Sequence, residues 1–174
     1  MSTESFITKT PENTSLLQAT KYTFTVPNLP FAKYFCQSVT MPGVATGAVP
    51  VSNPFSDIYR HGVKLTYDEL RLTFIVDEDL RVWEETYNWL RGVALPTKFQ
   101  EYIKHFDSKQ PIYYDGILTV NTNANLPNIR FKFTDCHPTN LSGITFNVSD
   151  SADNTITAEL GLRYDYFEIE RLPS

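Results

Sequence analysis

Residues 69–92 read ELRLTFIVDEDLRVWEETYNWLRG, and the change of pattern within this stretch decides the fold class. In its first part apolar side chains occupy every second position, which predicts a strand with one buried face. After the acidic run 77–79 the apolar spacing becomes helical, which predicts a helix over residues 80–91. Asp79 is the expected N-cap of this helix, and Gly92 can adopt the left-handed conformation that ends it. The alternating apolar positions are Leu70, Leu72, Phe74 and Val76.

The predicted helix is amphipathic. At about 100° per residue its apolar side chains cover one half of the cylinder, and polar or charged side chains cover the other half. Each buried large apolar side chain contributes roughly 1.5–3 kcal/mol, so packing against a sheet should stabilise this helix more than its surface ion pairs do. The face expected to enter the core consists of Leu80, Trp83, Tyr87 and Leu90, with Val82 and Trp89 beside it.

The same period of two recurs along the rest of the chain and predicts a mainly β (α+β) protein. The expected architecture is an antiparallel β-sandwich or barrel with one flanking amphipathic helix. Two weaker strand candidates cover residues 34–39 and 112–121, the second with a bend at Gly116. A second, shorter helix is expected over residues 97–105. The clearer strand patterns cover residues 22–26, 129–134, 144–149 and 156–166.

Residues 41–67 form a long stretch without the pattern of a core strand or helix, and we expect an extended arm there. Prolines and glycines interrupt it, and insertions of this length in compact domains usually have a function of their own. Its apolar side chains favour an arm that docks on a neighbouring subunit, although an extended hairpin folded back on its own domain fits equally well. These apolar residues are Val44, Val49, Val51, Phe55, Ile58, Tyr59 and Val63.

Length and charge narrow the class of protein. The 174 residues suit one domain over residues 21–174 after a lead-in segment over residues 1–20. A net charge of −5 argues against a surface that grips phosphates, but it does not exclude a protein that surrounds nucleic acid without binding it. The absence of an apolar leader and of a long apolar run predicts assembly in the cytoplasm without a membrane anchor.

The search for catalytic or metal-binding groups is nearly empty, and we expect no enzyme activity, cofactor or metal. The cluster Asp135-Cys136-His137 could be a nucleophile pair or half a zinc site, but neighbours on a strand point to opposite faces. The simpler interpretation is a buried cysteine, a histidine at a strand end and Pro138 as the strand stop. The acidic run 77–79 could bind a cation, although capping the helix explains it fully.

The order of parts resembles that of the tail tube protein family of contractile-tailed bacteriophages. The resemblance covers residues 22–168, and it is carried by the segment FCQSVTMPG (35–43), the strand-to-helix unit, the PTN turn (138–140) and the closing YDY (164–166). The family is similar to the tube protein of type VI secretion. It implies a β-barrel whose sheets join around hexameric rings, which stack into a hollow tube.

Partners and site residues follow from this resemblance. The arm would reach the adjacent ring, a tail sheath protein would surround the tube, and a baseplate tube initiator and a tail terminator would bound it. Genomic DNA would pass through an acidic lumen without specific binding, as like charges repel. The virion tail is the implied location, and the lumen candidates are Glu69, Glu159 and Asp165.

Three functional hypotheses result. The first is the repeated subunit of the tail tube, a structural virion protein that forms the conduit for genome delivery. The second is a tube initiator or another baseplate protein with the same fold. The third belongs to a different class, a monomeric β-barrel binding module or a Cys–His enzyme, which should bind a ligand or lose activity on Cys136→Ala.

Overall fold

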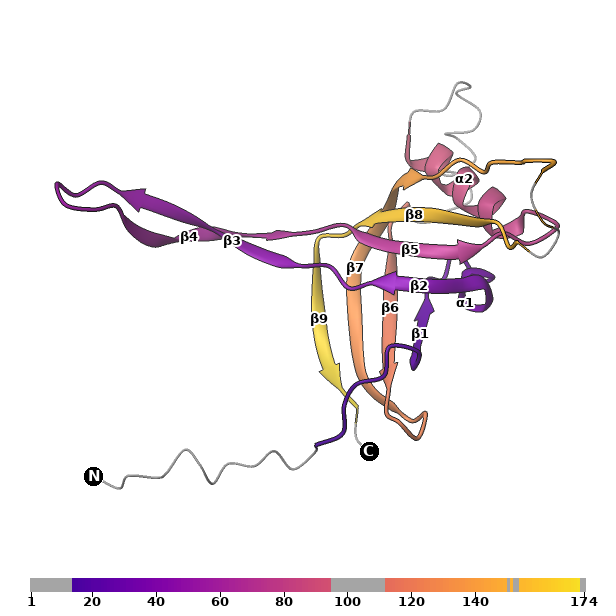
Figure 1. Cartoon of the computed structure of the whole chain (residues 1–174), viewed down its shortest axis with the longest axis horizontal. Helices are drawn as coiled ribbons and strands as arrows, with labels where there is room; N and C mark the ends of the chain where they lie inside the picture. Colours follow the sequence, from indigo (N-terminus) through magenta and orange to yellow (C-terminus); the bar gives the residue numbers. More distant parts are fainter. Residues whose placement is uncertain (1–13, 95–111, 150, 152–153, 173–174) are drawn as a thin grey trace.

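The computed structural model describes residues 14–94, 112–149, 151 and 154–172 (Figure 1). The elements follow one another along the chain as β1 (Tyr22–Thr25), α1 (Ala32–Phe35), β2 (Cys36–Thr40), β3 (Val44–Val51), β4 (Ile58–Tyr67), β5 (Leu70–Ile75), α2 (Arg81–Val93), β6 (Tyr114–Asn121), β7 (Pro127–Leu141), β8 (Thr157–Arg163) and β9 (Tyr166–Arg171).

β7 belongs to both halves of the main sheet. Its first half lies between β6 and β9, and its second half pairs with β8. Between the two halves Asp135 has a φ of 56°, in the left-handed region, and the register with β6 shifts at this level. This irregularity moves the buried positions from odd to even numbers, from Phe133 to Cys136 and Pro138. Both halves of β7 therefore turn buried side chains toward one core.

The main sheet is antiparallel throughout. One half has the order β1–β6–β7–β9 and the other the order β7–β8–β5–β2, while β3 and β4 form a separate hairpin. The two halves run across one another in Figure 1, with α2 packed against β7. The predicted antiparallel fold with one flanking helix is confirmed. In the described residues the sheet stays open, since β1 and β2 at its ends each have one partner strand.

The core lies between the two halves of the sheet and the helix. The predicted strand β5 buries Leu70, Leu72 and Phe74, as its alternation indicates. β8 places Leu160 and Leu162 opposite them, in register with Leu72 and Leu70. At roughly 1.5–3 kcal/mol for each large side chain, this cluster is the main source of stability. The other half of the sheet contributes Phe24, Leu118 and Phe133.

The strand predicted over residues 144–149 is wrong. Residues 142–147 have no regular structure, 148 and 149 form a turn, and Phe146 and Val148 are exposed. The alternation of side chains is present, but a strand also needs a neighbouring strand to pair with. Among the residues that the structure describes, no strand pairs with residues 144–149.

Three other strand predictions had the wrong limits. Pro138 does not stop β7, because the strand continues through it to Leu141. The segment predicted as one strand over residues 156–166 is divided, and β9 is a separate strand in the other half of the sheet. Tyr34 and Phe35 belong to the short helix α1 instead of a strand. The bend predicted at Gly116 is confirmed by the register shift there.

The predicted ends of α2 are also wrong. The N-cap is Leu80 in a left-handed conformation, and the carboxylate that accepts from the Arg81 backbone N–H at 3.2 Å belongs to Asp77. Asp79 instead pairs with the Arg81 guanidinium at 2.9 Å. Gly92 lies inside the helix, which ends where Ala94 becomes extended.

The face of α2 that enters the core differs from the predicted one. Val82, Thr86 and Trp89 are buried, and Tyr87 is exposed. Thr86 was missed because it is polar, but its hydroxyl donates to the Val82 carbonyl at 2.8 Å and can be buried at little cost. Trp83 stacks on Tyr87 at the edge of the core, with ring centroids 5.4 Å apart. Leu80 and Leu90 are likewise only partly buried.

Two predicted segments lie partly or wholly outside the described residues. The helix expected over residues 97–105 is one of them. Of the lead-in over residues 1–20, the structure describes residues 14–20, which contain no helix or strand and leave Leu16 and Leu17 exposed.

We expect Trp89→Ala to destabilise the protein more than Trp83→Ala. Trp89 is buried and its indole N–H donates to the Ile112 carbonyl at 2.9 Å, so its loss should cost about 3–5 kcal/mol. Trp83 is only partly buried, and its loss should cost about 1–2 kcal/mol. Chemical denaturation of both variants measures the difference, and equal losses would contradict this description of the helix face.

We expect Glu85→Gln to stabilise the protein at neutral pH. Burial raises the pKa of the Glu85 carboxyl, and the Asp77 carboxylate raises it further. Ionisation of Glu85 therefore opposes folding, and this penalty appears as pH rises through the folded-state pKa. The gain in melting temperature should be present at about pH 8 and vanish below about pH 4. Glu84→Gln, at an exposed position, is the matched control, and equal effects at every pH would contradict the prediction.

Candidate assembly site

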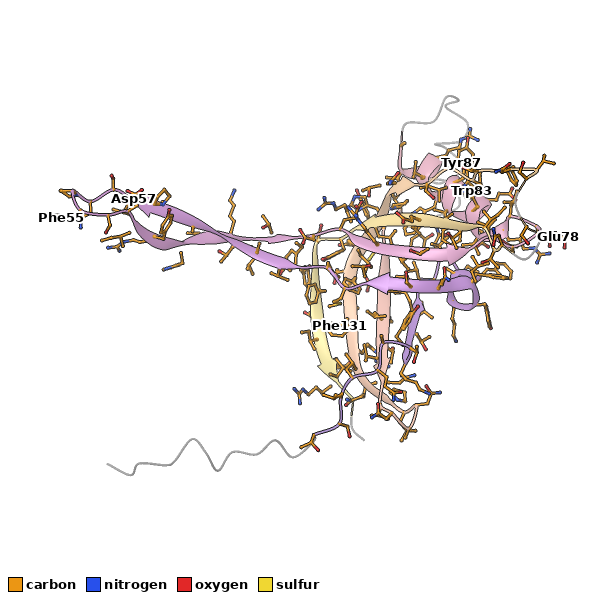
Figure 2. The ribbon with its side chains drawn as sticks, in the orientation of Figure 1. Phe55, Asp57, Glu78, Trp83, Tyr87 and Phe131 are labelled. Carbon is orange, nitrogen blue, oxygen red and sulfur yellow. The ribbon has the colours of Figure 1, made fainter. Side chains whose placement is uncertain are left out.

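The predicted arm is a β-hairpin of β3 and β4 that projects from the domain (Figures 1 and 2). The arm expected over residues 41–67 takes the form of a hairpin, the structure that the alternative interpretation named. The two strands pair only with each other among the described residues. The hairpin does not fold back on its own domain, because its tip around Phe55 and Asp57 lies at one end of the molecule and Glu78 at the other.

The hairpin leaves its apolar side chains in solvent. All of β3 is exposed, and β4 is exposed except for two half-buried positions. Phe55 retains 95% and Val63 99% of its accessible surface. Monomeric proteins rarely expose contiguous apolar side chains of this kind, which are typical of protein–protein contact surfaces. The other predicted arm residues are exposed as well: Val44, Val49, Val51, Ile58 and Tyr59.

A pair of glycines lets the two strands approach closely. The register shifts between Thr46, which lies opposite Leu65, and Ala48, which lies opposite His61, so β4 carries two extra residues opposite Gly47. A Cβ on Gly62 would meet the Gly47 carbonyl carbon at 2.9 Å, whereas a Cβ on Gly47 would have no atom within 4 Å. The strand crossing therefore requires glycine at position 62 but not at position 47.

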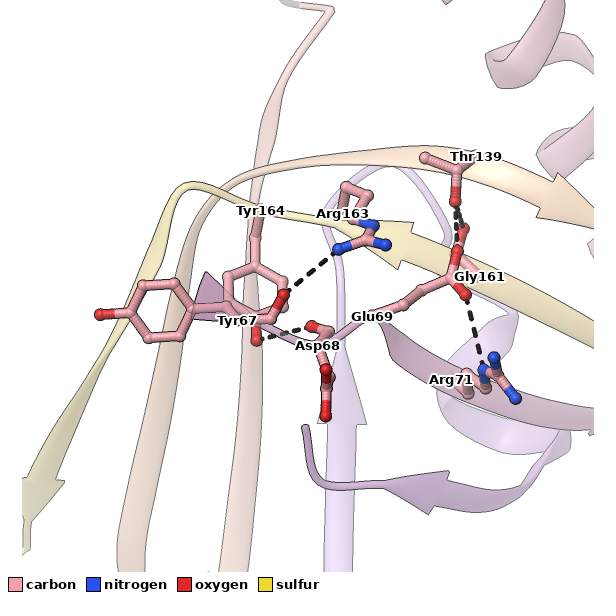
Figure 3. Close-up of polar contacts among 8 residues, drawn as sticks. All are labelled: Tyr67, Asp68, Glu69, Arg71, Thr139, Gly161, Arg163 and Tyr164. Carbon is pink, nitrogen blue, oxygen red and sulfur yellow. Dashed lines mark hydrogen bonds and ion pairs between the residues drawn. The ribbon is translucent and has the colours of Figure 1, made fainter. Parts of the chain in front are cut away.

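The base of the hairpin is anchored to β8 (Figure 3). The Arg163 guanidinium donates to the Tyr67 carbonyl at 3.2 Å, and the Tyr164 hydroxyl donates to the Asp68 carbonyl at 3.0 Å. The Tyr67 ring also packs against Tyr164 and Phe167 at 5.9 and 5.6 Å between centroids. Burial raises the pKa of Tyr164 to about 12, so its hydroxyl remains a donor at neutral pH. These contacts set the direction in which the hairpin leaves the domain.

Glu69 joins the hairpin base to three strands of the sheet (Figure 3). Its carboxylate accepts from the Thr139 hydroxyl at 2.5 Å and pairs with the Arg71 guanidinium at 3.5 Å. The same carboxylate lies over Gly161, where a Cβ would meet the Glu69 Cδ at 2.8 Å. Gly161 thus provides the space in which β5, β7 and β8 share one polar contact.

The lumen candidates are only partly brought together. Glu69 and Glu159 lie on the outer face of the β7–β8–β5–β2 half. Glu159 is exposed on β8, and the Glu69 carboxylate covers Gly161, which lies two residues further along β8. Arg71 and Arg163 are also exposed on this half, so the face is mixed in charge. Asp165 lies at the crossover from β8 to β9, where its N–H donates to the Thr134 carbonyl at 3.1 Å.

The Asp135-Cys136-His137 cluster lacks the geometry of a nucleophile pair. Cys136 is buried, its thiol contacts the Phe133 carbonyl at 3.7 Å, and burial raises its pKa to about 12. A thiol this reluctant to ionise is a poor nucleophile and a poor metal ligand. The His137 ring instead packs edge-to-face with Tyr113, with the ring centroids 5.5 Å apart. Cys136 is part of the core, in agreement with the simpler interpretation.

Other binding chemistry is equally sparse in the described part of the chain. Arg130 pairs with Glu170 at 3.3 Å and Lys132 with Asp115 at 3.2 Å, so these cations do not form an open nucleic-acid platform. Among the described residues there is no cluster of three or more side chains suited to a metal ion. No described helix has the length and apolar character needed to cross a membrane.

An open antiparallel sheet with an exposed apolar hairpin is typical of a protein that assembles with other subunits. Comparison with known families makes this specific, since the family described as phage tail tube protein matches residues 28–170. The chain belongs to the phage tail tube protein family, as the resemblance in sequence predicted.

Individual relatives agree with this family. The tail tube terminator protein of Enterobacteria phage T4 is 27% identical over 141 residues, covering 78% of this chain and 76% of the relative. The tube-terminating cap of the anti-feeding prophage shares the fold with a TM-score of 0.68 at 12% identity, covering 97% of this chain and all (100%) of that one. The sheath/tube terminator of the extracellular contractile injection system PVC has a TM-score of 0.59 at 12% identity, over 90% and 97% of the two chains.

Sequence reasoning found the hairpin residues but missed the anchor at its base. Glu69, Thr139 and the neighbouring pair Arg163 and Tyr164 are far apart in the chain, and no spacing in the sequence connects them. One signal was present: the closing YDY places Tyr164 beside a turn, where its hydroxyl could reach another backbone. The pairing of strands was needed to identify that backbone as Asp68.

We expect Gly62→Ala to loosen the hairpin without unfolding the domain. The added methyl group would push against the Gly47 backbone, and the hairpin contributes little to the core. Hydrogen exchange of β3 and β4 amides should accelerate, while the melting temperature of the domain stays unchanged. Gly47→Ala is the matched control because its methyl group would enter open space. Equal exchange in both variants would show that the close approach is unimportant.

Proposed function

We propose that this chain forms a hexameric ring that closes the end of the tail tube in a contractile phage tail. The observation that carries the proposal is the similarity to the T4 tail tube terminator over 78% of the chain. The likeness in fold to a tube-terminating cap over nearly the whole chain supports it. The expectation of a repeated tube subunit therefore gives way to a position at the tube end, and this role requires neither catalysis nor a cofactor.

The edges of the sheet support ring formation. In the half with the order β7–β8–β5–β2, the edges left open by the described residues are β2 and the side of β7 that faces away from β8. All neighbours are antiparallel and three pairings separate β7 from β2, so the two edges run antiparallel to each other. The β2 edge of one copy can thus extend the β7 edge of the next with the same alternation. A head-to-tail contact of this kind forms a ring when its rotation closes.

The hairpin has a different direction from the ring contact. It continues along the line of β5 (Figure 1), whereas edge pairing adds copies sideways to the strands. In a ring built in this way each hairpin leaves the rim along the ring axis. We assign its exposed apolar residues, such as Phe55 and Val63, to the last ring of the tube. A rigid base at Glu69 and Tyr164 would keep the hairpins of all copies parallel.

The outer face of this half-sheet would line the channel. It carries Glu69 and Glu159 as well as Arg71 and Arg163, and the chain as a whole has a net charge of −5. Such a surface offers phosphates no continuous positive track, so DNA could pass without specific binding. The tail sheath would then lie outside the ring, on the side of α2. Ring assembly would occur in the host cytoplasm, and the finished protein would reside in the virion tail.

Electron microscopy of the purified protein across a concentration series tests this proposal, with light scattering alongside. We expect sixfold rings that do not stack into long tubes. Long tubes would assign the chain to the repeated subunit instead, and a persistent monomer would contradict the ring. Deletion of residues 45–64 should leave the domain folded and the rings intact, because the hairpin lies outside the core.

The same deletion separates the ring contact from the tube contact. Rings of the deletion variant should fail to cap preformed tubes in a sedimentation assay, while full-length rings cosediment. Capping at the wild-type level by the deletion variant would rule out the hairpin as the element that binds the tube.

A further inference from the structure

The segment 142–149 has the pattern of a strand, but in the described part of the chain no strand pairs with residues 144–149. Ile144, Phe146 and Val148 alternate with Thr145 and other polar residues. Phe146 is 74% exposed and Val148 fully exposed. The segment starts beside α2, where the Trp83 indole N–H donates to the Ser142 carbonyl at 3.3 Å. Phe146 and Val148 therefore follow a residue that is fixed to the domain but are themselves exposed to solvent, and another surface is needed to bury them.

A second surface with exposed aromatic side chains lies at the opposite edge of this half-sheet, next to β2. Phe31, Tyr34 and Phe35 of the α1 region line a cavity of about 470 Å³, together with Asp77–Asp79 and Arg81. Tyr34 is 77% exposed and so is available to a partner. The Arg81 guanidinium lies over the Phe31 ring at 5.6 Å and pairs with Asp79. Tyr34 and Phe35 therefore form the side of the cavity that remains available to a partner.

The sheet register puts these two surfaces at the same level. Through the three pairings that connect β7 to β2, Leu141 lies level with Val39. β7 and β2 run in opposite directions, so the residues after Leu141 and the residues before Cys36 lie at the same end of the sheet. That end is opposite to the hairpin (Figure 1). When a second copy extends the sheet, its segment 142–149 therefore meets the α1 region of the first.

We propose that the segment 142–149 of each copy packs through Phe146 and Val148 against the Tyr34 and Phe35 side of the α1 cavity on the next copy. This inference rests on the ring proposed above and names the contact that completes its seam. The occupant is a second copy of this chain, because the alternating strip continues directly from the β7 edge. The segment 142–149 contains no charged residue, so its approach to Asp77–Asp79 brings no like-charge repulsion.

The competing occupant is the segment's own chain. Phe146 also lines a cavity with Leu80 and Ile156 of the same copy, on the other side of Asp77. Phe146 also lines a hollow with residues 154–157 of the same copy, yet it remains 74% exposed. Packing of Phe146 against a second copy would bury the rest of its aromatic side chain together with Tyr34.

Substitution of the exposed residues tests the contact. Phe146→Asp and Tyr34→Asp should each reduce ring formation at least about tenfold in sedimentation velocity, since each removes a large apolar side chain from the seam. Their melting temperatures should stay near that of the wild type, because both positions are exposed in the single chain. Leu126→Asp is the matched control, an equally exposed apolar residue in the β6–β7 turn that should leave the rings intact.

Cross-linking locates the contact even if a charged variant folds poorly. In a Cys36→Ser background, Tyr34→Cys combined with Phe146→Cys should give disulfide ladders between copies on a non-reducing gel. Persistent rings in Phe146→Asp, or a cross-link only within one chain, would overturn the contact and leave the ring proposal standing. A wild-type protein that remains monomeric at every concentration would overturn both.

Discussion

The rest of the structure depends on the change of alternation in β7 at Asp135. A regular strand of this length would carry Phe133 into the core and then turn Cys136 and Pro138 toward solvent. The left-handed residue shifts the alternation by one position, so all three are buried in one core. The two sheet halves are thereby joined by a continuous backbone yet run across one another. This arrangement leaves β2 and the far side of β7 as open, antiparallel edges.

The stability of the domain and its capacity to assemble reside in different parts of the molecule. Core burial is concentrated in the half-sheets and α2, where residues such as Phe74 and Trp89 are almost fully enclosed. The hairpin and the segment 142–149 hold apolar residues that contribute nothing to this core. We propose that those residues contact another subunit, because a single chain gains little from them. The polar anchor around Glu69 connects the two parts by fixing the hairpin to the sheet.

Sequence reasoning succeeded where a pattern is local and failed where a partner strand decides. The alternation of Leu70, Leu72 and Phe74 predicted β5 and its buried face correctly. The equally regular alternation around Phe146 predicted a strand that the single chain does not form, because strands require hydrogen-bonding neighbours. Conversely, the arm contains poor strand residues such as Pro50, yet β3 and β4 pair along its length. An arm and a hairpin were separate alternatives from the sequence, whereas the structure combines them in a hairpin that projects from the domain.

The sequence by itself determined the antiparallel β class, the single long helix, the exposed apolar arm and the resemblance to tail tube proteins, since these depend on composition and local periodicity. The tertiary structure decided which face of α2 is buried, where β7 changes its alternation and which edges stay open. Apolar character alone assigns Trp83 and Tyr87 to the buried face of α2 before Thr86, but the packing of the helix against the sheet decides which side chains are buried. Contacts such as that between Glu69 and Thr139 join residues far apart in the chain, and only folding brings them together.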